Sequence, residues 1–141
     1  MNALVGGIKR FNNRFWILCV VNSFGYASVH AFYPNMSKFF QEKFHFNNTE
    51  AGVISSIPYA IASVSVPIIG SLLRGKTDQV YLDFMILGLG CIFVVHLFYF
   101  AMIGSDGGFF PIAPVFIFGL GHAIFTTLIP STTPKILDSP D

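Results

Sequence analysis

The sequence predicts an all-α, polytopic membrane protein with four transmembrane helices. Four stretches of about 20 residues each contain no Asp, Glu, Lys or Arg, and about 20 apolar residues are enough to cross the hydrocarbon core of a bilayer. Of the 141 residues, 53% are hydrophobic and only 11% are charged, so a water-soluble fold would lack polar side chains to cover its surface. The lipid bilayer is therefore the expected partner of most of the chain.

The four predicted spans follow one another with short connections. The first begins after a polar N-terminal segment, 1–14, and its charge-free run, Phe15–Tyr33, is longer than the apolar core of a usual signal peptide, which is the alternative interpretation. The aromatic and charged segment 32–46 is expected to extend this helix beyond the membrane, with its rings at the headgroups. The four-helix region, 15–135, precedes a tail, 136–141, and its helices are expected at about 15–40, 49–73, 81–103 and 109–130.

The second span has the clearest start signal. Asn47, Asn48 and Thr49 each offer a side-chain oxygen that can cap a helix, and the charge of Glu50 favours the positive end of the helix dipole. Many residues of this span are small, which lets helices approach one another closely in lipid. We therefore expect this helix to begin near Thr49 and to pack against other helices.

Two prolines interrupt the backbone hydrogen bonds of the second span. Pro58 and Pro67 lack an N–H group, and a transmembrane helix tolerates such residues when other groups bind the freed carbonyls. The hydroxyls of Ser55, Ser63 and Ser65 are the expected partners of these carbonyls.

The charges in the loops predict the orientation, because cytoplasmic loops of membrane proteins are rich in Lys and Arg. One side of the predicted spans carries Lys38 and Lys43, whereas the other carries Lys9, Arg10, Arg14, Arg74, Lys76 and Lys135. Both termini, including the segment 1–14, are therefore expected in the cytoplasm. The sequons at Asn35 and Asn47 then lie on the opposite side, although such triplets are frequent by chance.

Polar residues form a stripe in the first span. Asn22, Tyr26 and His30 follow at intervals of four residues and share one face of a helix. Polar groups within a bilayer are costly and usually face a bundle interior or a water-filled path. The stripe is interpreted either as a substrate-facing surface or as a set of hydrogen bonds between helices, and the sequence leaves both open.

The fourth and second spans add three candidate site residues. His122 and Thr126 are again four residues apart, and Gly119 and Gly121 beside them let a neighbouring helix or a ligand approach the backbone. His122 could carry a proton or bind a peptide carboxylate, and a neutral His bound to a carbonyl is the structural alternative. Tyr59 could reach a cavity from the second span or anchor the backbone of a neighbouring helix.

The remaining candidates indicate structural roles and no enzyme. His96 stands alone in the third span, and Cys19 and Cys91 lie in apolar runs, where they are expected as core residues. The four histidines lack the short spacing of metal ligands, so neither a metal nor a cofactor is expected. The sequence contains no HExxH, GxSxG, CxxC, P-loop or GxGxxG motif, and without a basic run it predicts no nucleic-acid partner.

Four stretches of the sequence resemble a known family. In chain order they are FYPNMSKFFQEKFHF, FNNTEAGVISSIPYAIASVSVPIIGSLLRGKTD, VVHLFYF and PVFIFGLGHAIFTTLIPSTTPKILDSPD. They resemble helices seven to ten, in the C-terminal half of a major facilitator superfamily transporter, and are nearest to the branch of lysosomal dipeptide transporters. The superfamily's short cytoplasmic loop usually carries an acidic residue four positions after a glycine. Here Arg74 follows Gly70 at that spacing, so the gating contacts attributed to this loop lack their acidic residue.

The resemblance implies a location for each span and a function. The first and fourth spans would line the central cavity of the transporter, the second would flank it, and the third would face mostly lipid. The implied function is secondary active or facilitative transport of small polar organic solutes by alternating access, with short peptides or amino acids favoured. Its substrate-binding candidates are Asn22, Tyr26, His30, Tyr59, His122 and Thr126.

Two interpretations of the whole chain remain. Four helices cannot enclose a cavity that two pseudo-symmetric halves build together, so transport would need the remaining transporter helices as partners. The alternative is a transport-incompetent, transporter-like structural subunit of a larger membrane complex. The resemblance implies an endolysosomal membrane, with the plasma membrane and the mitochondrial inner membrane as alternatives.

Overall fold

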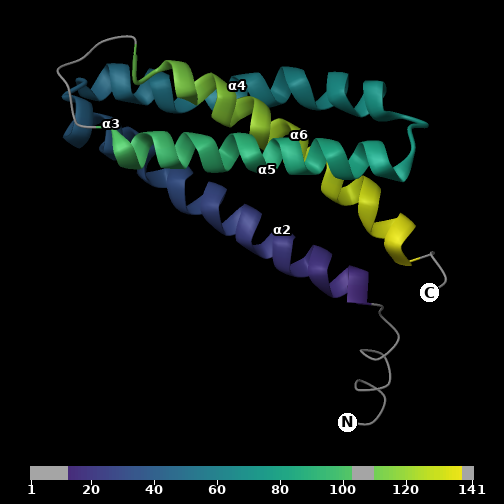
Figure 1. Ribbon diagram of the computed structural model, residues 1–141. Helices are drawn as coiled ribbons and strands as arrows, with labels where there is room; N and C mark the ends of the chain where they lie inside the picture. The colour runs from purple at the N-terminus through teal and green to yellow at the C-terminus, as the bar shows by residue number, and fades with distance from the viewer. Residues whose placement is uncertain (1–12, 103–109, 138–141) are drawn as a thin grey trace, which may run out of the picture.

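The computed structural model describes residues 13–102 and 110–137 of the chain (Figure 1). The helices in these residues are α2 (Asn13–Phe32), the 3₁₀ turn η1 (Tyr33–Asn35), α3 (Met36–Phe44), α4 (Asn48–Leu73), α5 (Asp78–Ala101) and α6 (Ala113–Leu137), and the same residues contain no strand. Helical segments long and apolar enough to cross a membrane are Phe15–Phe44, Asn48–Leu73, Asp78–Ala101 and Ala113–Pro130. The predicted all-α fold with four membrane-spanning helices is therefore confirmed for the described part of the chain.

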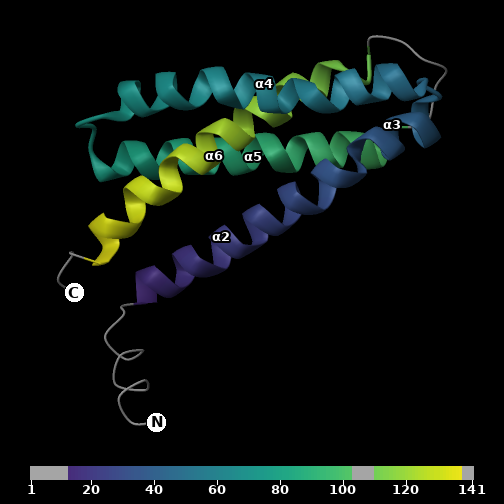
Figure 2. The same cartoon turned by 180° about the vertical axis from the view of Figure 1, so that it is seen from behind.

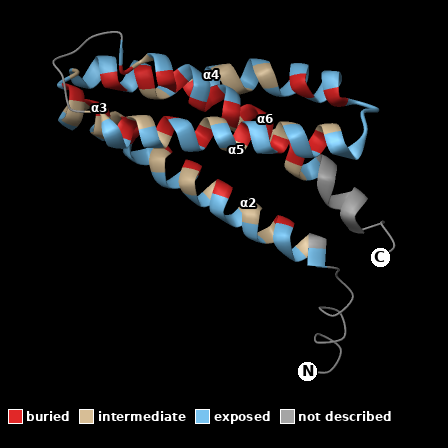
Figure 3. Ribbon diagram, in the orientation of Figure 1, coloured by how far each residue is buried: buried red, intermediate tan, exposed pale blue. Residues whose placement is uncertain are grey.

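The central helix of the bundle is α6. The helices α4 and α5 run side by side, and α6 crosses them at an angle, as both views show (Figures 1 and 2). Half of the apolar window of α6 is buried, against 17% for α4 and 28% for α5. Exposed and intermediate residues predominate along α2 (Figure 3), so this helix lies at the outside of the bundle.

Glycines allow α6 to approach α4 and α5 at backbone distance. A Cβ atom added at Gly119 would lie 2.9 Å from Cα of Pro58 in α4. A Cβ atom added at Gly121 would lie 2.9 Å from the carbonyl oxygen of Gly88 and 2.8 Å from Cβ of Cys91, both in α5. These approaches are closer than ordinary van der Waals contact, so the two crossings require glycine on α6.

A capping box begins α4. The side-chain oxygen of Asn47 accepts a hydrogen bond from the Glu50 N–H at 2.9 Å, and the Glu50 carboxylate accepts one from the Asn47 N–H at 3.0 Å. Among the three predicted caps, Asn47 is thus the one used, and the helix begins at Asn48. The pair satisfies two backbone donors that the first turn of a helix leaves free.

The serines of α4 differ from the prediction. Pro58 and Pro67 each free the carbonyl four residues before them, and Ser55 and Ser63 were the expected donors to these carbonyls. Their hydroxyls instead donate to carbonyls one turn before each serine, at 2.7 and 2.8 Å. The prediction is wrong for these two residues, because a serine on a helix reaches most easily the carbonyl of its own preceding turn.

Aromatic rings hold α3 against the end of α5. Phe40 and Phe44 are fully buried, and their ring centroids lie 5.8 and 6.3 Å from that of Tyr99. The Tyr99 hydroxyl donates to the carbonyl of Pro111 at 2.8 Å, just before α6. The Lys43 ammonium donates to the carbonyl of Tyr99, in the last turn of α5, where the helix dipole favours a cation. Segment α3 is therefore fixed to α5 and to the start of α6.

Candidate functional site

The most polar contact between distant parts of the bundle joins η1 to α6. The Tyr33 hydroxyl lies 3.0 Å from Nδ1 of His122, and the ring of Tyr59, from α4, stacks on that of Tyr33 at a centroid distance of 4.3 Å. A neutral His122 with its proton on Nε2 accepts the hydrogen bond from Tyr33, and a proton on Nδ1 reverses the direction. We call Tyr33, Tyr59 and His122 the three-ring cluster.

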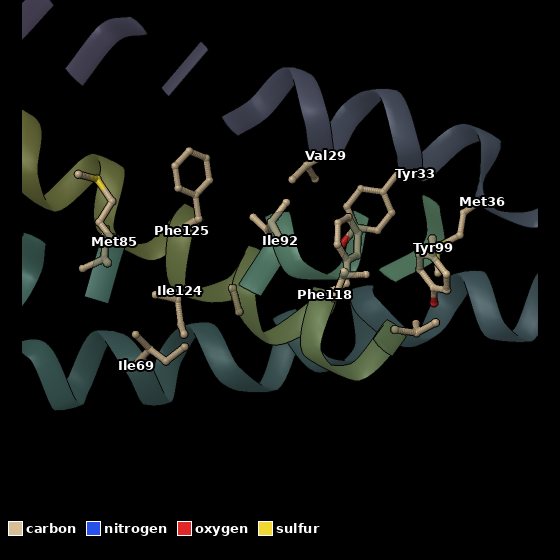
Figure 4. Close-up of a cluster of buried hydrophobic side chains, with 14 of the residues drawn as sticks. Val29, Tyr33, Met36, Ile69, Met85, Ile92, Tyr99, Phe118, Ile124 and Phe125 are labelled. Atoms are coloured by element: carbon tan, nitrogen blue, oxygen red, sulfur yellow. The ribbon is translucent and has the colours of Figure 1, made fainter. Parts of the chain in front are cut away.

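The local sequence explains why Tyr33 is in this position. Pro34 lies in the first turn of η1, and the missing N–H of proline favours a local change from α-helical to 3₁₀ hydrogen bonding. Tyr33 is consequently buried and packs edge-on against Phe118 of α6 at 5.4 Å (Figure 4). The 3₁₀ turn thus places one hydroxyl among apolar rings, where His122 is its hydrogen-bond partner.

The sequence analysis did not identify Tyr33 as a site residue. It follows His30 by three residues and Tyr26 by seven, so it continues the polar stripe of the first span. This spacing was the available signal. The stripe was ended at His30 because Tyr33 stands beside Pro34, where the helix was expected to leave the membrane.

The predicted stripe on α2 faces α6. The Tyr26 ring stacks on the ring of His30 at 5.4 Å with an angle of 11° between the planes, and it contacts the ring of Phe125 at 5.6 Å. His30 is exposed and Tyr26 is half-buried. Asn22 is half-buried as well, and its Oδ1 is buried with no hydrogen-bond partner. Each member of the stripe therefore has a different environment.

The contact between α2 and α6 depends on a glycine and a ring. A Cβ atom at Gly25 would overlap the ring of Phe125, which is fully buried and projects from α6 towards α2 (Figure 4). Phe118 and Phe125 were not among the predicted site residues. Their apolar side chains carry no signal that separates a site wall from ordinary core, and only the fold shows that they border the polar residues of α2.

The remaining predicted site residues have different environments. The Thr126 hydroxyl donates to the carbonyl of His122 at 2.9 Å, so it is bound within its own helix. Gly119 and Gly121 face α4 and α5, which means that neighbouring helices, not a ligand, occupy the space beside them. Tyr59 is 56% exposed, although one face of its ring is covered by Tyr33.

His96 has a local partner, as expected for a structural residue. Its Nδ1 lies 2.8 Å from the carbonyl oxygen of Ile92, one turn earlier in α5. Its ring also contacts Phe32 and Phe118 edge-on, at 5.2 and 5.6 Å. Among the described residues no group of three His, Cys, Asp or Glu side chains could hold a metal ion. The three-ring cluster and the α2 stripe are therefore the candidate site.

Comparison with known proteins gives one partial similarity. The chain is 35% identical over 65 residues to a protein of Gallus gallus named lysosomal dipeptide transporter MFSD1, and the match covers 46% of this chain but 15% of that protein. No protein-family model matches the chain, and no solved structure matches it significantly. Together with the four apolar helices, the similarity supports a transporter-like, multi-pass membrane protein.

Proposed function

We propose that the chain forms part of a transporter for small polar organic solutes, with short peptides or amino acids as the favoured substrates. The partial similarity to a dipeptide transporter supports this class. In this proposal the four spans correspond to helices seven to ten of a major facilitator superfamily transporter. They work by alternating access with further helices, in an endolysosomal membrane. The matched segment is a small fraction of the relative, so substrate and mechanism come from the proposal.

The observation that carries the proposal is the hydrogen bond between Tyr33 and His122. Polar side chains inside a bilayer are costly and tend to mark solute or proton paths. This pair joins η1 to α6, while the exposed part of Tyr59 and the exposed His30 adjoin the same helices. A solute that reaches these rings would find hydrogen-bonding groups from α2, α4 and α6, none of which carries a carboxylate between Ala51 and Leu73 or between Phe109 and Ile129.

A transport-incompetent structural subunit is the second candidate. The observation that favours it is the internal satisfaction of polar groups: Tyr33 and His122 bind each other, and Thr126 binds its own helix. In this case the three-ring cluster holds the bundle together and contacts no solute.

The two candidates differ in the expected effect of replacing the histidines. We expect His122→Ala to lower the uptake of radiolabelled glycylglycine, measured with the chain in the complete membrane protein that contains it. His96→Ala is the matched control, because His96 binds a carbonyl of its own helix. Equal losses of uptake at equal surface expression would remove His122 from the site. Unchanged uptake with a lower melting temperature for His122→Ala would favour the structural subunit.

A further inference from the structure

Asn22 is the residue whose environment the proposed function leaves unexplained. Its Oδ1 is buried and makes no hydrogen bond within the described part of the chain. Buried polar atoms in proteins almost always have a partner, and an unpaired one destabilises the fold. The other described polar residues of the predicted site have ring contacts or a hydrogen bond. Asn22 is therefore the place where a hydrogen-bond donor is missing.

The position of Asn22 shows where such a donor would bind. Gly25 and Tyr26, three and four residues later, both contact Phe125 of α6, and residues at these spacings share a helix face. Asn22 thus lies on the side of α2 that faces α6, one turn towards the N-terminus from the closest approach. Its neighbours on α2, Ser23 and Phe24, are exposed, so the outer edge of this contact is open.

The chemistry of the surroundings restricts the donor. Neither Phe15–Tyr33 nor Phe109–Ile129 contains a charged residue, so a carboxylate would meet an acceptor oxygen and no cation. An ammonium group has only donors, and its hydrogen bonds to oxygen are about twice as strong as those between neutral groups. Aromatic faces attract cations as well, and the ring of Tyr26 lies one turn from Asn22.

We infer that Asn22 accepts a hydrogen bond from the ammonium group of the solute, at the contact between α2 and α6. This inference rests on the proposed transport function and names the part of the solute that these helices recognise. The side chains of Gly25 and Phe125, not backbone crossings, make the contact, so a small separation of α2 from α6 exposes Oδ1. The ammonium group then supplies the donor that the protein lacks.

Two peptides and two variants test the inference in the purified chain in lipid nanodiscs. Glycylglycine has an ammonium group, and N-acetylglycylglycine replaces it with an amide while keeping the carboxylate. We expect wild-type protein to bind glycylglycine about tenfold or more tightly than the acetylated peptide, the effect of one charge-assisted hydrogen bond. Asn22→Leu should abolish this preference, and Asn22→Asp, which keeps the acceptor oxygen, should retain it.

Melting temperature separates a solute-binding Asn22 from a structural one. Asn22→Leu removes a buried unpaired acceptor, so we expect its melting temperature to stay equal or rise while the preference is lost. Ser23→Ala is the control, because the Ser23 hydroxyl binds the carbonyl of Cys19 in its own helix, and it should change neither quantity. A lower melting temperature for Asn22→Leu with the preference intact would overturn the inference. Equal wild-type affinity for both peptides would overturn it and leave transport standing, whereas no binding of either peptide would overturn both.

Discussion

The two sides of α6 contact their neighbours in different ways. Towards α4 and α5, Gly119 and Gly121 bring backbone against backbone at distances that admit no further atom. Towards α2, the contact is made by side chains: Phe125 lies over Gly25, and His122 meets Tyr33 through one hydrogen bond. The first side is apolar and closely packed, and the second carries the polar groups.

This difference separates the fixed part of the bundle from the part that can admit a solute. Close-packed backbone contacts cannot change by small steps without overlap. Side-chain contacts can change by rotation of a ring, and a polar group released from one partner can bind another. The predicted site residues Asn22, Tyr26 and His30, together with His122, all lie on the second side. Binding is therefore expected where the packing is made by side chains.

The largest effect is expected at the α5–α6 crossing. A methyl group at Gly121 would overlap Cys91 and the Gly88 carbonyl, and overpacking of this kind costs about 1–3 kcal/mol. Gly121→Ala should therefore lower the melting temperature in detergent. Gly90→Ala is the control, because nothing lies within 4 Å of a Cβ atom there, and it should be neutral. Equal stability of the two variants would break the distinction between the sides of α6.

A smaller effect is expected at Gly25, on the other side of α6. An alanine there would displace the ring of Phe125, but a ring can move where a backbone cannot. We expect Gly25→Ala to lower the free energy of unfolding by about 1 kcal/mol, at the lower end of overpacking effects. The measurement is the same melting experiment as for Gly121→Ala. A loss as large as that of Gly121→Ala would show that the α2 contact is as rigid as the α5 crossing.

The smallest effect on stability is expected for Tyr26→Phe. The described contacts of Tyr26 are the rings of His30 and Phe125, and phenylalanine preserves them. If the Tyr26 hydroxyl binds solute, affinity for glycylglycine should fall by about two- to tenfold, the value of one neutral hydrogen bond, while the melting temperature stays the same. A lower melting temperature with unchanged affinity would assign the stripe to packing.

Local features of the sequence were sufficient for the helices. The absence of charge over about 20 residues is decided by the solvent, lipid, and needs no tertiary contact. The cap at Asn47 is also local, since its partner Glu50 is three residues away. These features predicted four membrane-spanning helices and the start of α4 near Thr49.

The contacts that make the site are not local. Tyr33 and His122 are 89 residues apart, and no pattern in either segment indicates the other. For Gly119 and Gly121 the sequence left a helix and a ligand as equal alternatives, because a glycine shows only that something approaches closely. The structure identifies α4 and α5 as those neighbours. Which face of α2 meets α6 likewise depends on how the helices pack.

The 3₁₀ turn at Tyr33–Asn35 has a mechanical consequence. The capping box at Asn47 and the Lys43 hydrogen bond anchor α3, whereas α2 extends from the turn as a single helix of 20 residues. At about 1.5 Å per residue this helix is a lever roughly 30 Å long, so a rotation of about 10° at the turn would carry its far end about 5 Å. Gly25 and Asn22 lie partway along the lever, and a small change of angle beside Pro34 would therefore open the contact with α6 by a graded amount along α2.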